Sequence, residues 1–176
     1  FALYTAMELS TGLWAFLLLT EGRGLSTGVA GVCVAGYWAS LTVGRVLVGW
    51  VSEHIGPRRV IAASIAGLAV GAGLVAIPAP AWVAVVGLAV VGLSAAPVFP
   101  MMTLTTSDRV GDDHAARAIG IQIGAASVGA ALIPAAIGVV LARTTPDALG
   151  LLLLALALAL AAVYALAQRS SSAAPG

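Results

Sequence analysis

Apolar residues run through this chain in long stretches, and short polar breaks separate the stretches. A helix that crosses a bilayer needs about 20 consecutive, mostly apolar residues. Runs of that length predict six spans, at Phe1–Thr20, Gly28–Ser52, Arg59–Ile77, Ala81–Thr106, Arg117–Ala142 and Ala148–Gln168. The breaks hold glycine, proline and most of the charge, as turns do. We therefore expect an all-α membrane protein, with a six-helix bundle at residues 1–168 and a disordered cytoplasmic tail at residues 169–176.

The composition fits a surface that faces lipid. Of 176 residues, 61% are hydrophobic and 9% are charged, and the mean hydropathy is +1.08. A soluble domain carries about 25% charged residues. A net charge of +1 gives no reason to expect nucleic acid, and the single Cys33 allows neither an internal disulfide nor a cysteine-rich metal site. We expect no metal and no cofactor.

The arginines indicate how the spans are oriented. One side of a six-span arrangement carries Arg58, Arg59, Arg109, Arg117 and Arg169, and the other carries Arg23 and Arg143. Because cytoplasmic loops are enriched in arginine and lysine, both ends of the chain are predicted to be cytoplasmic. We expect an integral protein of a bacterial inner (plasma) membrane. No basic segment precedes the first apolar run, so that run is not read as a signal peptide, and the chain is expected to be a fragment.

Glu8 lies inside the first predicted span, where a carboxylate costs roughly 2–4 kcal/mol before any compensation. Helical spacing places Tyr4, Thr5, Thr11 and Gly12 on the same face. No arginine lies three or four residues away on that helix to pair with the acid. Glu8 is then either a structural carboxyl bonded to another helix or an acid that binds solute or carries a proton. We favour the second interpretation.

Two other spans carry polar or aromatic side chains beside ridges of small residues. In the fifth span, a small-residue stripe is predicted to pack against a neighbour, and Gln122 projects from nearly the opposite face. That stripe consists of Gly120, Gly124, Ser127, Ala131, Ala135 and Gly138. In the second span, Tyr37 and Trp38 lie beside a similar ridge of Gly36, Ser40 and Gly44. These three larger side chains either bind solute or only pack and bond between helices.

The stretch "GRVLVGWVSEHIGPRRV" (Gly44–Val60) resembles the cytoplasmic loop signature of the major facilitator superfamily, G-x-x-x-D-R-x-G-R-R. The sequence departs from it because Glu53 replaces aspartate, His54 replaces a basic residue, and Pro57 stands where a basic residue is common. The resemblance implies a cytoplasmic gating latch in which one glycine allows close helix approach, the next permits the turn, and charges close the helix pair. The residues of this predicted latch are Gly49, Glu53, Gly56, Arg58 and Arg59.

Three further stretches are similar to helices seven, ten and eleven of the fucose–proton symporter-like branch of this superfamily. They are "YTAMELSTGLW" (Tyr4–Trp14), "GLSAAPVFPMM" (Gly92–Met102) and "AIGIQIGAASVGAALIPAAIG" (Ala118–Gly138). The resemblance implies the C-terminal half of a twelve-helix major facilitator fold with 3+3 inverted repeats. It also implies an N-terminal six-helix half as partner, and alternating access to a central site.

The expected function is secondary active transport of a small solute, such as a sugar, coupled to protons. Glu8 is the predicted proton-coupling residue, and Tyr4, Thr11, Tyr37, Trp38 and Gln122 are the predicted solute-binding residues. Proton-driven efflux of drug-like solutes, which Met101 and Met102 would suit, and a non-transporting sensor or assembly subunit remain alternatives. An enzyme is not expected, because the histidines and aspartates fall in predicted loops or at span edges, and no acid–base or nucleophile–base pair can be assembled.

Overall fold

The computed structural model describes the backbone of residues 1–172, and their side chains except at 50, 51, 108, 109, 112 and 170–172. Within this range, six helical segments are long and apolar enough to cross a membrane. They are Ala2–Gly22, Thr27–Gly49, Pro57–Ala76, Ala81–Leu104, Asp113–Arg143 and Ala148–Arg169. Each overlaps one predicted span, so the six-span prediction is confirmed, and so is the all-α fold class.

The described residues form only helices and the connections between them. In chain order these are α1 (Ala2–Leu17), the π-helical turn η1 (Leu18–Gly22), α2 (Thr27–Ile55), α3 (Pro57–Ala76), α4 (Ala81–Ala95), α5 (Val98–Leu104), α6 (Ser107–Val110), α7 (Asp112–Arg143) and α8 (Ala148–Ser172). Helix α8 continues beyond Gln168, so the predicted tail begins in helix rather than in disorder at Arg169. The rest of that tail, 173–176, lies outside the described residues.

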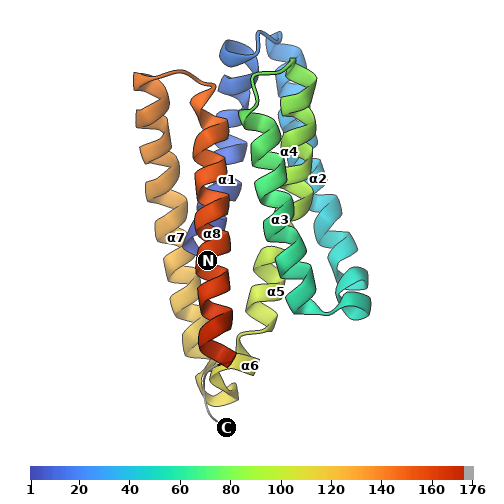
Figure 1. Ribbon diagram of the computed structural model, residues 1–176, viewed down its shortest axis with the longest axis vertical. Coiled ribbons are helices and arrows are strands. Elements are labelled where there is room, and N and C mark those ends of the chain that lie inside the picture. Colours follow the sequence, from blue (N-terminus) through green and yellow to red (C-terminus); the bar gives the residue numbers. More distant parts are fainter. Residues whose placement is uncertain (173–176) are drawn as a thin grey trace.

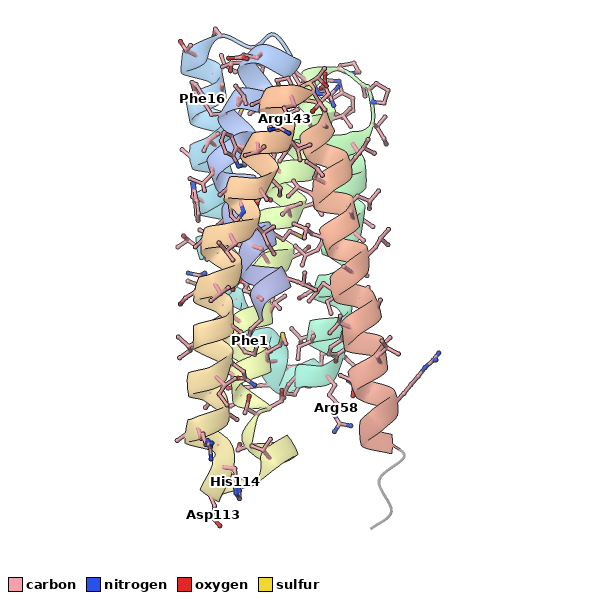
Figure 2. All side chains as sticks on the ribbon, turned by 90° about the vertical axis from the view of Figure 1, so that its left-hand side faces the viewer. Phe1, Phe16, Arg58, Asp113, His114 and Arg143 are labelled. Carbon is pink, nitrogen blue, oxygen red and sulfur yellow. The ribbon has the colours of Figure 1, made fainter. Side chains whose placement is uncertain are left out.

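The long helices stand side by side, and their connections alternate between the two ends of the bundle (Figure 1). Residues 23–26, 77–80 and 144–147 lie at one end, and the connections at Gly56 and at 105–111 lie at the other. Figure 2 shows Arg143 at the first end, and Asp113 and His114 at the second. Helix α1 packs against α7 and α8, α3 packs against α4 and α8, and α2 packs against α4.

Prolines interrupt the fourth span and give it its shape. Helix α4 ends at Ala95, a turn follows at Ala96 and Pro97, and α5 begins at Val98. Proline lacks the amide hydrogen that a continuous helix needs, and its ring clashes with the preceding turn. The interruption matters for function because α5 carries Phe99 and Pro100, which line the cleft described below.

Glycines allow close helix contacts on α2, α3 and α4. A Cβ added to Gly71 on α3 would lie 2.9 Å from the Gly87 carbonyl oxygen on α4, and one added to Gly44 on α2 would lie 2.6 Å from the Ala96 Cβ. In lipid, helices associate through such close packing of small residues. The ridge predicted on α2 therefore contacts a neighbour at Gly44, whereas the Cβ position of Gly36 has no heavy atom of another described segment within 4 Å.

The predicted packing stripe of α7 is wrong for most of its length within this chain. Outside the helix's own backbone, no heavy atom of the described residues lies within 4 Å of the Cβ positions of Gly120 or Gly124, whereas the Cβ position of Gly138 meets the Trp14 ring. The opposite face makes the close contact, because a Cβ on Gly129 would lie 2.4 Å from the Ala2 carbonyl oxygen. Helical periodicity shows which residues share a face, but it does not show which face the neighbouring helix takes.

Candidate functional site

An ion pair joins the first two helices inside the membrane-spanning part of the bundle. Nη2 of Arg45 on α2 donates a hydrogen bond to Oε1 of Glu8 on α1 at 3.1 Å. The Glu8 side chain is 12% exposed and that of Arg45 is 52% exposed. Opposite charges at this distance attract strongly where water is scarce. Arg45 therefore offsets much of the cost of placing the Glu8 carboxylate in an apolar span.

Two buried tyrosines complete the surroundings of Glu8. The Tyr4 hydroxyl donates to the Glu8 carboxylate one helical turn away, and the Tyr37 hydroxyl donates to the Glu8 backbone oxygen at 2.8 Å. The two tyrosines are only 2% and 1% exposed. Because polar groups in a dry interior are costly to leave unbonded, the bond from Tyr37 holds α1 and α2 in one register, and the bond from Tyr4 fixes the carboxylate along α1. The Glu8 side chain has little freedom while its partners stay in place.

A cleft of about 550 Å³ lies beside the ion pair. It is lined by Tyr4, Thr5, Glu8, Arg45, Val48, Phe99 and Pro100. These residues come from α1, α2 and α5, and their polar groups lie on α1 and α2 while α5 supplies apolar surface. Most small-molecule sites are concave and largely apolar, with a few placed polar groups, and the cleft has this composition.

Trp38 and Tyr37, both predicted to bind solute, lie outside the lining of this cleft. The Trp38 indole covers Gly12, because a Cβ on that glycine would lie 2.2 Å from Trp38 Cζ2. The Tyr37 and Trp38 rings contact each other edge to face, with centroids 5.1 Å apart. In this conformation both aromatic side chains pack α2 against its neighbours. Tyr37 is connected to the cleft lining by its hydrogen bond to the Glu8 backbone oxygen.

Thr11 and Gln122, the other two predicted solute-binding residues, are held by protein partners. Thr11 is fully buried, and its hydroxyl donates to the Met7 carbonyl oxygen at 2.8 Å. The Thr106 hydroxyl donates to Gln122 Oε1 at 3.1 Å, which connects α7 to the segment between α5 and α6. Neither residue lines the cleft beside Glu8. Of the two interpretations given above for Gln122, this contact agrees with the one in which the amide bonds a neighbouring segment.

Arg45 was not among the residues predicted for the site, although it lies within the stretch that begins at Gly44. Helical spacing pairs Glu8 only with residues of its own helix, whereas Arg45 is 37 residues further along the chain. A usable signal was present, because a charged residue inside an apolar span is rare and usually pairs with another charge or marks a solute pathway. One arginine and one glutamate inside adjacent predicted spans are therefore a candidate ion pair.

The residues of the predicted latch lie where α2 ends and α3 begins. Gly56 has φ +88°, a backbone conformation that favours glycine, and it makes the turn between α2 and α3. Outside its own helix backbone, no heavy atom of the described residues lies within 4 Å of the Gly49 Cβ position, so the close helix approach predicted there stays a prediction. Within the part of the chain that the structure describes, no ion pair joins Glu53 to Arg58 or Arg59.

Comparison with known proteins identifies the family. The family model described as Major Facilitator Superfamily matches residues 1–175. A stretch of 52 residues is 36% identical to Bypass of stop codon protein 6 of Saccharomyces cerevisiae, and this stretch covers 30% of the chain but only 10% of the yeast protein. No solved structure matches the chain. These matches single out no branch, so the fucose–proton symporter-like branch stays a prediction. Because the family match covers nearly the whole chain, the protein belongs to the Major Facilitator Superfamily.

Proposed function

We propose that this chain is the C-terminal half of a secondary active transporter, which moves a small solute past the cleft at Glu8 by alternating access. An N-terminal six-helix half would supply the other wall. Membership of the superfamily and the six spans support a transporter in general. The observation that carries the proposal is the Glu8–Arg45 pair at the cleft, because charged groups inside a membrane span are expensive and usually serve a pathway.

Glu8 is the proposed proton-coupling residue, and Arg45 changes how the coupling would work. While the pair is intact, the guanidinium compensates the charge of the carboxylate. A solute or a helix movement that separates the pair leaves the carboxylate without its counter-charge, and a bound proton would then neutralise it. Proton binding would thus follow the separation of Glu8 from Arg45, which gives the transport cycle a step that solute can trigger.

The experiment that tests this function is uptake of a solute panel by the full-length protein in proteoliposomes under an imposed pH gradient. Glu8→Gln keeps the shape of the side chain but cannot carry the proton, so it should abolish accumulation and leave downhill exchange intact. Glu8→Ala should damage both, because it also removes the contacts with Tyr4 and Arg45. If Glu8→Gln still accumulates solute with a normal pH dependence, the coupling residue lies elsewhere.

Efflux of drug-like solutes is the second transport function to be tested. The apolar lining of the cleft, at Val48, Phe99 and Pro100, is the observation that favours it over sugar uptake. The direction of net movement under the same gradient separates the two. A complete absence of solute movement in the panel would instead support a sensor or assembly subunit.

Glu53, Arg58 and Arg59 remain the proposed charges of a gating latch, now as groups that would pair in another conformation or with the other half. The proposed setting is a bacterial inner membrane with both ends of this chain in the cytoplasm. The arginine distribution supports that orientation.

A further inference from the structure

We propose that the cleft beside Glu8 binds an organic anion with an apolar body, and that Arg45 holds the anionic group. This inference rests on the proposed transport function and names the chemical class of its solute. The inference depends on which hydrogen-bonding groups around the cleft are bonded within the protein and which are available to a solute.

Arg45 has most of its donors open. A guanidinium carries five N–H donors in a planar fork, and the hydrogen bond that the structure gives Arg45 uses one of them, on Glu8. The side chain is 52% exposed and lines the cleft. Carboxylates bind such a fork through two parallel hydrogen bonds, which adds orientation to the charge attraction. Arg45 can therefore bind an anionic group without first losing its hydrogen bond to Glu8.

The other polar groups of the cleft are already bonded within the protein. Both Glu8 carboxylate oxygens are engaged, one by Arg45 and the other by the Tyr4 hydroxyl. The Thr5 hydroxyl donates to the Phe1 backbone oxygen at 3.2 Å. A polyol such as a sugar needs several available donors and acceptors, whereas the available donors of this cleft are concentrated on the Arg45 guanidinium. A cation would have to compete with Arg45 for Glu8.

The rest of the lining determines the body of the solute. Val48 is buried, and Phe99 and Pro100 on α5 present partly buried apolar surface to the same space. The Phe99 ring is braced edge to face by Phe1, with centroids 5.3 Å apart. A volume of about 550 Å³ is large enough for an aromatic ring or a short alkyl chain next to the anionic group. The geometry thus favours a small amphipathic monoanion.

The test compares matched acids and amides on the full-length protein in nanodiscs. Benzoate and hexanoate are titrated beside benzamide and hexanamide, with binding followed by calorimetry and by the shift in unfolding temperature. Each acid should bind at least about 10-fold more tightly than its amide, as expected for a hydrogen bond to a charged group. Arg45→Gln should abolish this preference, and Arg45→Lys should retain part of it. Arg143→Gln is the control, because Arg143 is an exposed arginine at one end of the bundle (Figure 2).

Glu8→Gln distinguishes binding from a structural role of the pair. If Arg45 binds the solute anion, removing the negative charge of Glu8 should tighten benzoate binding, by about threefold or more, because that charge repels a bound anion. If the pair only holds α1 to α2, Glu8→Gln and Arg45→Gln should both lower the unfolding temperature, and neither should change the acid–amide preference. If Arg45→Gln fails to fold, the benzoate affinity of Glu8→Gln and the acid–amide preference of Arg45→Lys still test the inference.

Three results would overturn the inference. They are equal binding of acids and amides, no binding of either acid, and weaker benzoate binding by Glu8→Gln. Uptake of the solute panel distinguishes failure of the anion assignment from failure of the proposed transport function. If Arg45→Gln still transports neutral or cationic solutes, the transport function is supported and the anion assignment is contradicted. If no solute moves, both proposals are contradicted.

Discussion

Nε of Arg23 lies 3.4 Å from Oδ1 of Asp147, so the connection that follows η1 is joined to the connection that precedes α8. The same guanidinium donates to the carbonyl oxygens of Val75 at 2.9 Å, Ile77 at 3.0 Å and Ala79 at 3.3 Å. A cation at the C-terminal end of a helix satisfies open carbonyls and complements the helix dipole. One side chain, 8% exposed, therefore connects three segments at one end of the bundle.

Arg23→Ala should destabilise the protein by about 2–3 kcal/mol, because it leaves the carbonyls at the end of α3 without their charged donor. Asp147→Asn is the matched change on the other partner. It should cost less than about 1 kcal/mol, because the Asp147 side chain is 50% exposed and its pairing is weakened by water. Unfolding temperatures in one detergent measure both. Equal losses would show that the ion pair, rather than the carbonyl contacts, is the stabilising element.

Gly71→Ala should weaken the packing of α3 against α4. The added methyl would lie 2.9 Å from the Gly87 carbonyl oxygen and 2.9 Å from the Val91 amide nitrogen, and backbone atoms cannot move aside cheaply. A loss of about 1–3 kcal/mol is expected for such overpacking. Gly73→Ala on the same helix is the control, because no heavy atom of another described segment lies within 4 Å of its Cβ position. Thermal unfolding of both variants measures the difference, and similar losses would reject the packing explanation.

Ser10→Ala should stabilise the protein. The Ser10 hydroxyl is fully buried, and it has no hydrogen-bond partner among the described residues. Removing a buried polar group without a partner should raise stability by about 1 kcal/mol. Thr11→Val is the comparison, since its hydroxyl is bonded to the Met7 carbonyl oxygen, and it should have no stabilising effect. A lower unfolding temperature for Ser10→Ala would mean that the hydroxyl has a partner, such as water or another segment.

The orientation in the membrane can be tested with single cysteines at Ser52 and Thr145, in a Cys33→Ala background. Ser52 lies near the end of α2, and Thr145 lies in the connection at the opposite end of the bundle. A membrane-impermeant maleimide should label Thr145→Cys from outside intact cells and Ser52→Cys only after permeabilisation. The reversed pattern would contradict the arginine-based orientation, and labelling of both from one side would contradict the six-span arrangement.

Local properties of the chain were sufficient to predict the six spans and the turn at Gly56. The length of an apolar run and the chemistry of its breaks are properties of neighbouring residues, and membrane insertion depends on them directly. The same holds for the face shared by Tyr4 and Glu8, because residues one helical turn apart meet without help from the rest of the fold.

The partners across helices depend on the tertiary structure. Arg45 reaches Glu8 because α2 lies against α1 with that rotation about its axis, and no pattern within either helix specifies the rotation. The same cause placed Gln122 on Thr106 and turned the Gly120 side of α7 away from the bundle. In lipid, a helix gains nothing from burying one apolar face rather than another, so close packing and hydrogen bonds between helices decide which faces meet.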